Sequence, residues 1–182
     1  MESKIAYIGV DPGKQGFITL MKDGEFTFYP MPYHKIDTGE VTKTGKAKTK
    51  SVFHIEGLRE LCFQIRKETQ DYHLKVAIEE VGGRGGWSAT NNFEFGYTAG
   101  LQKMIFVMLG AEIIMVRPQK WQSYMRQGYP EIKKPSSTGK TMISDPKAVA
   151  KVIVDAEYSN IDFRKTERAT KVDDNKIDSF LV

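Results

Sequence analysis

The sequence predicts an α/β fold whose sheet mixes antiparallel and parallel strands. Three short runs of apolar and β-branched residues, 5–10, 16–21 and 26–29, follow one another with turn residues between them, as in an antiparallel meander. A helical pattern over 52–69 then leads into a further apolar run at 74–81. This helix can carry the chain back over the sheet, so the later strand lies parallel beside the first one.

Length and composition are those of one globular domain spanning residues 1–182. Hydrophobic residues make up 40% of the chain, which supplies a core of ordinary size. The net charge is +4, and cations are concentrated between residues 117 and 151, where eight Lys and Arg residues accompany two acids. A basic segment of this kind is compatible with nucleic-acid binding.

Cysteine usage and hydropathy exclude several classes of protein. The lone cysteine, Cys62, cannot form an internal disulfide or a cysteine-built zinc site, and it fits a reducing compartment as a small buried residue. No secretory signal opens the chain, and the longest apolar run, 105–116, is too short to cross a bilayer. We therefore expect a soluble intracellular protein.

The first strand, 5–10, ends in an acid, Asp11. Burying an ionised carboxylate is costly unless another group pairs with it. Asp11 therefore marks either a functional site or an Asx turn, in which the side chain binds its own backbone. Gly9 stands where another backbone could approach the strand closely, and Gly13 can take the positive φ of a tight turn.

Two segments connect the meander to the next strand. Residues 38–50 are polar and lysine-rich, which predicts a loop that is either solvated surface or a contact to a phosphate backbone. Residues 52–69 carry apolar side chains at helical spacing, with Ser51 as the N-cap. The parallel strand that follows would bring Glu79 to the strand end next to Asp11.

The loop after this strand has four glycines around Arg84 and ends at Trp87. It is either a plain connector or a flexible loop through which both side chains reach a nucleic acid, and we favour the second because it follows the acidic strand end. The next helix, capped by Thr90 or Asn91 and running to about Leu109, is apolar nearly all round. Such a helix is buried on two sides, against the sheet and against either a second subunit or another part of the chain.

The C-terminal half alternates short elements with a long basic segment. We expect a strand at 112–116, a loop at 127–146, a helix at 146–158 and a last helix that begins at about residue 171. Asp178 lies within the apolar face of that last helix, where a carboxylate is out of place. Asp173 and Asp174 stand at its N-terminus, where acids also favour the helix dipole.

Acids from three elements thus reach the edge of the predicted core. Asp11, Glu79 and Asp178 would repel one another, and a hard divalent cation such as Mg²⁺ would neutralise them. Two such ions about 3.5–4 Å apart can hold the attacking water and the leaving oxygen of a phosphodiester. Such a site beside a basic surface predicts a nuclease whose affinity for its substrate falls as salt rises.

Four motifs occur in series along the chain. They are Ile8-Gly9-Val10-Asp11-Pro12-Gly13, Ala77-Ile78-Glu79-Glu80-Val81, Val116-Arg117-Pro118-x-x-Trp121 and Asp174-Asn175-Lys176-Ile177-Asp178-Ser179. In this order and spacing, the chain resembles the RuvC-type Holliday-junction resolvases, most of all their phage and mitochondrial-poxviral branches. The resemblance covers nearly the whole chain; Asp-Pro-Gly alone is a weak signal, whereas the four motifs together are quite specific.

The resemblance implies an RNase H-like fold, in which three antiparallel strands and further parallel strands form one sheet flanked by helices. It implies a homodimer whose two active sites cut opposed strands of a four-way DNA junction with Mg²⁺ or Mn²⁺. It places the protein in the cytoplasm of a bacterial or phage-infected cell, or in another reducing compartment that holds DNA. The helix at 91–109 matches the family's dimer element, and the loop after Glu79 matches one that enters the junction.

The same resemblance assigns the site residues. Asp11, Glu79 and Asp178 match family metal ligands. Many members carry Asp or His three residues before the last acid; here that residue is Asn175, and we assign Asp174 as the fourth ligand. Relatives continue the last helix, so we expect that the chain is truncated after Val182. The DNA contacts that we expect are Arg84, Trp87, Arg117, Lys120, Lys133, Lys134 and Lys140.

Other functions stay open on the sequence. One is an RNase H-like nuclease of RNA processing, against which the long basic loop and Trp121 argue mildly. Another is a catalytically impaired module that binds branched nucleic acid, which Asn175 favours. Actin-like and sugar-kinase ATPases also open with a strand, Asp and Gly, but they need a larger two-lobed chain.

Overall fold

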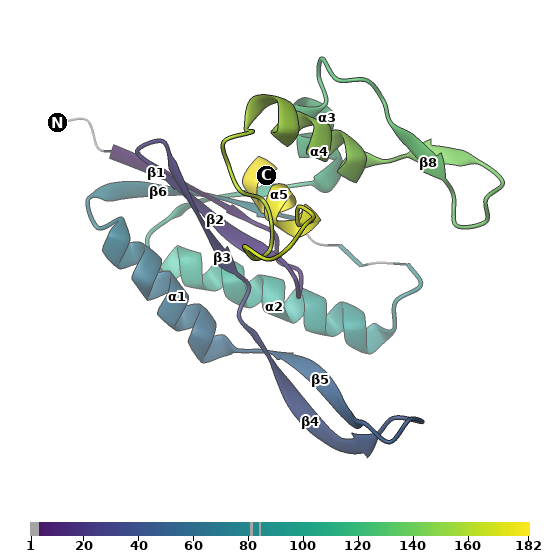
Figure 1. Ribbon diagram of the computed structural model, residues 1–182. Helices are drawn as coiled ribbons and strands as arrows, with labels where there is room; N and C mark the ends of the chain where they lie inside the picture. The colour runs from purple at the N-terminus through teal and green to yellow at the C-terminus, as the bar shows by residue number, and fades with distance from the viewer. Residues whose placement is uncertain (1–3, 81, 84) are drawn as a thin grey trace.

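A computed structural model describes residues 4–80, 82–83 and 85–182 (Figure 1). Its centre is a five-stranded sheet in the order β3-β2-β1-β6-β7. The first three strands pair antiparallel, whereas β6 lies parallel to β1 and β7 parallel to β6. The mixed sheet that the sequence predicts is confirmed. Its strands are β1 Lys4–Val10, β2 Phe17–Lys22, β3 Glu25–Pro30, β6 Tyr72–Glu79 and β7 Glu112–Val116.

Helices cover both faces of this sheet (Figure 1). One face carries α1, Ile55–Glu68, and α2, Ala89–Met108. The other face carries α4, Pro146–Glu157, and α5, Asp174–Leu181, with α3, Pro118–Met125, packed on α4. The sheet flanked by helices that the resemblance implies is therefore also confirmed.

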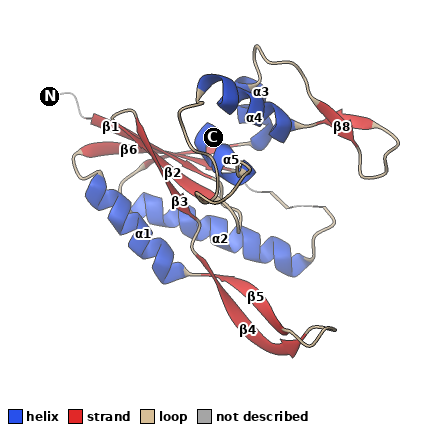
Figure 2. Cartoon of the chain, in the orientation of Figure 1, coloured by secondary structure: helices blue, strands red, loops and turns tan. Residues whose placement is uncertain are grey.

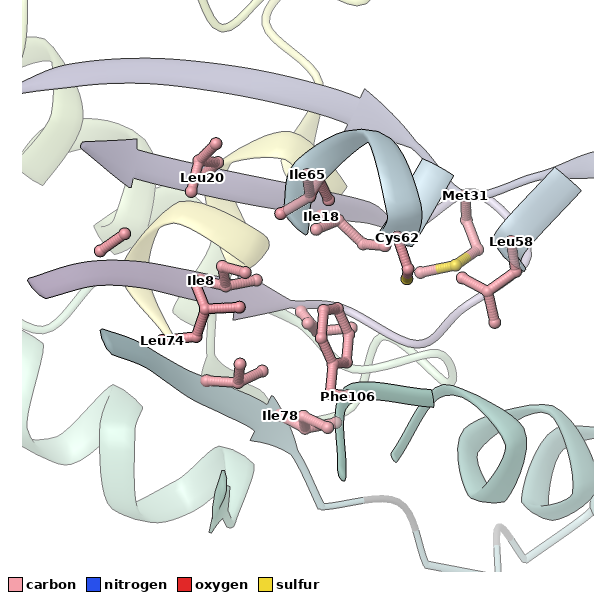
Figure 3. Close-up of a cluster of buried hydrophobic side chains, with 13 residues drawn as sticks. Ile8, Ile18, Leu20, Met31, Leu58, Cys62, Ile65, Leu74, Ile78 and Phe106 are labelled. Carbon is pink, nitrogen blue, oxygen red and sulfur yellow. The ribbon is translucent and has the colours of Figure 1, made fainter. Parts of the chain in front are cut away.

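The larger core lies between the sheet and α1 and α2 (Figure 3). Alternate residues of each strand point to this face because side chains alternate along a strand, and Ile8 and Ile78 are examples. Cys62 and Phe106 meet them from α1 and α2 and are fully buried. Burial raises the pKa of the Cys62 thiol to about 12, so the cysteine serves as a small apolar residue, as the sequence predicts.

A second core lies on the other face of the sheet, beneath the C-terminal helices. Ile153 of α4 and Ile177 of α5 are almost wholly buried there, and Trp121 of α3 is the largest side chain in the cluster. Phe180 contacts the rings of Phe26 and Phe163 at centroid distances of 4.9 and 5.1 Å. These contacts fix α5 against the meander, which decides where its carboxylates lie.

The prediction of a loop at 38–50 is wrong. The segment forms a two-stranded hairpin of β4, Tyr33–Val41, and β5, Ala47–Phe53, which projects from the body (Figure 2). Ser51 lies in β5 and caps no helix, since α1 begins after His54. The hairpin has no buried face, so the alternation of apolar and polar residues that marks a strand is missing from its sequence.

The long basic segment also contains structure that the sequence does not reveal. A short hairpin of β8, Lys133–Pro135, and β9, Met142–Ser144, lies within the predicted loop at 127–146. Pro118 opens the unpredicted helix α3 at its first position, where a missing N–H costs nothing. The helix α2 begins two or three residues earlier than expected, with Ser88 as its cap: the side chain accepts from the amide of Asn91.

One face of α2 remains uncovered in the single chain. Phe93 and Met108 are 73% and 74% exposed, and Tyr97 and Met104 lie on the same side of the helix. These four side chains therefore form an apolar outer face of the helix, whereas Thr98, Gln102 and Phe106 point inward. Among the described residues, no helix combines the length and the apolar character needed to cross a membrane.

Candidate active site

The register between β1 and β6 brings two carboxylates to one edge of the sheet. Val10 opposite Ile78 is the last pair of this parallel ladder. The carboxyl ends of parallel strands meet at the same edge, so Asp11 and Glu79 leave the sheet as neighbours. This is the placement that the sequence predicts for them.

The turn after β1 holds Asp11 in place. Its Oδ1 accepts a hydrogen bond of 3.1 Å from the amide of Gly13, and its own amide donates to the carbonyl of Phe17 at 3.1 Å. A Cβ on Gly16 would lie 2.0 Å from the Asp11 carbonyl oxygen, so only glycine fits there. The predicted Asx turn is present, and it is compatible with a place in an active site because the Gly13 amide uses a single lone pair of Oδ1.

Helix α5 reaches this edge because Gly9 has no side chain. A Cβ on Gly9 would lie 2.0 Å from the carbonyl oxygen of Ser179, so the helix backbone crosses directly over β1. The close approach that the sequence predicts at Gly9 is confirmed. A buried hydrogen bond of 2.7 Å between the hydroxyls of Thr19 and Ser179 joins the same helix to β2.

The acids of α5 have different roles. Asp173 caps the helix, since its Oδ1 accepts from the amides of Asn175 and Lys176 at 2.9 and 3.4 Å. Asp178 lies in the second turn of the helix and lines the cavity described below. Its pKa is raised from 3.8 to about 6, mainly by burial and further by the charges of Asp11, Asp174 and Asp173, against which Lys147 acts in the opposite direction.

A cavity of about 830 Å³ opens at this edge. Asp11, Glu79 and Asp178 all line it, although they come from β1, β6 and α5. Aromatic side chains line it as well, including Trp87 and Phe95, whose ring centroids are 5.7 Å apart. The arrangement combines carboxylates with surfaces on which nucleic-acid bases can stack.

The structure differs from the sequence-based assignment of the fourth metal ligand in one respect. Asn175 lines the cavity, whereas Asp174 is absent from its wall and accepts a hydrogen bond of 3.3 Å from Lys147 Nζ. The Asn175 side chain is oriented by Nδ2, which donates to Asp173 Oδ1 at 3.1 Å. Its Oδ1 is a neutral oxygen at the position where the family resemblance leads us to expect Asp or His.

The residues around the cavity fit a hard divalent cation by their chemistry. Carboxylate and amide oxygens are the donors that Mg²⁺ prefers, and a cation beside Asp178 would reverse the rise of its pKa. Within the described part of the chain, however, no three Asp, Glu, His or Cys side chains are grouped closely enough to hold one metal ion. Metal binding would therefore have to draw these side chains together.

Sequence reasoning missed Lys147. It lies in the first turn of α4, lines the cavity and contacts Asp174. A cation at a helix N-terminus opposes the helix dipole, and this is the one local signal that could have marked it. Its partners, Asp174 and Asp178, are distant in sequence, so its position follows only from the packing of α4 on α5.

Of the predicted DNA contacts, Trp87 and Arg117 line hollows at this edge. Arg84 lies outside the described residues. Trp87 lines the main cavity, and Arg117 lines a second hollow that it shares with Glu79; there its Nε contacts Glu80 Oε2 at 3.0 Å. Lys120 is exposed on α3.

The remaining predicted contacts belong to the β8–β9 hairpin. Lys133 forms an exposed ion pair with Glu131 at 3.2 Å, and Lys134 contacts the N-cap of α4, Asp145, at the same distance. Lys140 is exposed in the turn between the strands. Exposed ion pairs are weak, so these lysines can exchange their partners for phosphate.

No protein-family model matches the chain, and no curated protein matches it in sequence. Among solved structures, the chain is similar to Thermus thermophilus RuvC in complex with a Holliday junction substrate, with 9% identity over 97% of this chain and 91% of that chain and a TM-score of 0.47. A second T. thermophilus RuvC structure shows 12% identity over 97% and 92% of the two chains, with a TM-score of 0.44. The yeast mitochondrial Holliday junction resolvase shows 11% identity over 98% and 75%, with a TM-score of 0.45.

Proposed function

We propose that this protein is a structure-selective endodeoxyribonuclease that resolves four-way and other branched DNA junctions by paired, metal-dependent phosphodiester hydrolysis. The observation that carries the proposal is the meeting of Asp11, Glu79 and Asp178 at one cavity. Three carboxylates beside a polyanionic substrate are useful only with a cation between them, and this combination is typical of phosphodiester hydrolysis. The four sequence motifs support the choice of branched DNA.

The ligands in this proposal are Asp11, Glu79 and Asp178, with Asp174 or the amide oxygen of Asn175 as the fourth. When bound, Mg²⁺ or Mn²⁺ would activate a water molecule and neutralise charge on the phosphate. The chain itself supplies the positioning: the Asx turn orients Asp11, and the contact between Gly9 and Ser179 holds α5.

Other residues of the site would handle the substrate. Lys147 stands beside the acids and offers a cation to a phosphate oxygen. Trp87 and Phe95 present rings to bases that separate from their partners at a branch point. Arg84, Arg117, Lys120 and the lysines of the β8–β9 hairpin would bind the DNA backbone and make affinity dependent on salt.

We further propose a homodimer built on the outer face of α2. This face exposes Phe93, Tyr97, Met104 and Met108, and apolar side chains gathered in this way on a helix usually cover a partner. Two copies related by a two-fold axis would present two sites at once, which paired cleavage of opposed strands requires.

Cleavage of a labelled four-way junction tests the proposal, with a linear duplex of the same sequence as the control substrate. Paired nicks on the junction alone, dependent on Mg²⁺, are expected. Asp11→Asn should bind the junction as the wild type does and cleave it at least roughly a hundredfold more slowly, because it removes a metal ligand and no DNA contact. Equal cleavage by this variant would remove Asp11 from the site.

The neutral Asn175 at the cavity favours one second candidate, a module that binds branched DNA without cutting it. Tight, junction-selective binding with no nicks in Mg²⁺ or Mn²⁺ would establish that function instead. Cleavage of structured RNA in preference to the DNA junction would point to an RNA-processing nuclease.

A further inference from the structure

The β4–β5 hairpin is an exposed, cationic arm beside the active site. Every residue from 34 to 50 is exposed, and residues 33–53 contain five lysines and two acids. The hairpin is held by its own polar contacts, such as the 2.8 Å hydrogen bond from Thr38 Oγ1 to the carbonyl of Lys48. An ordered hairpin that contributes little to the core is a candidate for a binding element.

Three of the lysines lie on one face of this arm. Lys46, Lys48 and Lys50 are alternate residues along β5 and its approach, so their side chains point the same way. Lys50 pairs across the hairpin with Ile36, whereas Lys35 pairs with Ser51 and therefore belongs to the opposite face. The three cations recur at roughly 6.7 Å along the strand, about two steps of 3.4 Å along one strand of DNA.

This face leads to the acidic cavity. Lys50 Nζ contacts Glu94 Oε1 of α2 at 2.6 Å, and Lys50, Val52 and Phe53 line the cavity together with Asp11. The row of lysines thus runs along β5 toward Lys50, which lines the cavity. A phosphate strand that follows the row would enter the cavity.

From this row we infer a substrate-binding arm: the Lys46–Lys48–Lys50 face of the β4–β5 hairpin binds the sugar-phosphate backbone of a duplex DNA arm next to the cleavage site. The inference rests on the proposed function, because the cavity defines which DNA would lie there. An acidic protein partner fits less well, since Ile36 and Val41 are the large exposed apolar side chains of the hairpin and lie apart from each other. The exposed pair of Lys48 with Glu40 at 2.7 Å is weak and can yield to phosphate.

The test compares two double variants for their affinity to a labelled four-way junction without metal, across a salt series. Lys46→Gln/Lys48→Gln removes two of the three proposed contacts and leaves Lys50, which ties the hairpin to Glu94. The matched control, Lys35→Gln/Lys67→Gln, removes the same charge from the opposite face of the hairpin and from α1. We expect about tenfold weaker binding and a salt slope lower by about 2 for the first variant, with the control within about twofold of wild type.

Glu40→Gln provides a change in the opposite direction. It removes an acid that competes with DNA for Lys48, so the junction should bind more tightly. Equal losses in the two double variants, or no loss in either, would overturn the inference, and unfolding midpoints would show that each variant is folded. Binding is measured without metal, so it tests the arm independently of cleavage. If the nuclease proposal fails, the wild-type protein will not cleave the junction, but its binding will still depend on Lys46 and Lys48.

Discussion

Gly9 of β1 lies directly beneath the carbonyl oxygen of Ser179 in α5, where a Cβ atom would approach that oxygen to 2.0 Å. A separation of this size is far below van der Waals contact, so any side chain at this position would push the helix from the strand. The contact brings α5, the helix that carries Asp178, to the edge where Asp11 leaves the sheet. The absence of a side chain at Gly9 thus allows Asp178 to lie near Asp11.

Gly9→Ala should destabilise the protein by at least about 2 kcal/mol. The new Cβ would clash with a backbone oxygen of α5, and backbone atoms cannot rotate away as a side chain can. Urea unfolding measures the loss. Gly96→Ala is the control: its Cβ would meet nothing within 4 Å, and alanine in a helix stabilises slightly. Equal stability of the two variants would show that α5 does not rest on β1 as described.

Asp178 gives the metal-free protein a defined pH dependence. Its folded pKa of about 6 lies above the unfolded value, so the folded state holds the proton more tightly. This group's contribution is fully favourable below about pH 4 and is lost as pH rises to about 6, a change of at most about 3 kcal/mol. Asp178→Asn should therefore equal wild type at pH 4 and exceed it in stability at pH 7.5 in EDTA, and Mg²⁺ should narrow the difference.

Two lysine variants control this interpretation. Lys147→Gln removes the cation that lowers the pKa of Asp178, so the loss of stability should move to higher pH. Lys151→Gln, one turn further along α4 and exposed, should leave it where it is. A shift of the same size in both variants would mean that net charge, rather than contact at the site, causes the effect.

Asn175→Asp should strengthen metal binding. The change places a fourth carboxylate at a position that already lines the cavity, and Mg²⁺ affinity should rise roughly tenfold because ligand charge sets affinity for hard cations. A titration of the unfolding midpoint with Mg²⁺ measures this without any cleavage assay. Asp174→Asn serves as the comparison. If Asp174→Asn weakens Mg²⁺ binding and Asn175→Asp does not strengthen it, the fourth ligand is Asp174.

The outer face of α2 predicts the state of the protein in solution. Wild type should have the mass of a dimer at micromolar concentration by light scattering, and Met104→Glu should be monomeric because it places a charge in the apolar contact. Phe63→Glu is matched in exposure, 61% against 57% for Met104, but lies on α1 and should remain dimeric. A monomeric wild type would contradict the proposed assembly.

The sheet could be predicted because its strands bury side chains, and burial leaves a pattern of apolar residues in the sequence. This apolar pattern and the crossover helix were together enough to predict that Asp11 and Glu79 lie at the same edge of the sheet. The two hairpins could not be predicted in this way. Their strands are largely exposed on both faces, so they are held by backbone pairing and a few side-chain contacts, which leave no periodic signal in the sequence.

Side chains whose role depends on packing between distant elements were equally inaccessible. Lys147 carries no motif, and only the packing of α4 against α5 places it among the acids. The sequence showed that α2 is apolar nearly all round, but the side left uncovered depends on how α1 and the sheet pack against it. Asn175 could be identified from its neighbours in the motif. Its place on the cavity wall could be seen only once the orientation of α5 was known.

The hydrogen bond between Thr19 and Ser179 joins residues 160 positions apart in the chain. At about 5–20 residues per second, a ribosome that has released the opening meander needs roughly ten to thirty seconds more to synthesise the helix that completes the acidic site. A nascent chain therefore holds Asp11 and Glu79 without Asp178 until the ribosome has passed α5. The acidic edge is complete only after α5 has been made and docks over Gly9.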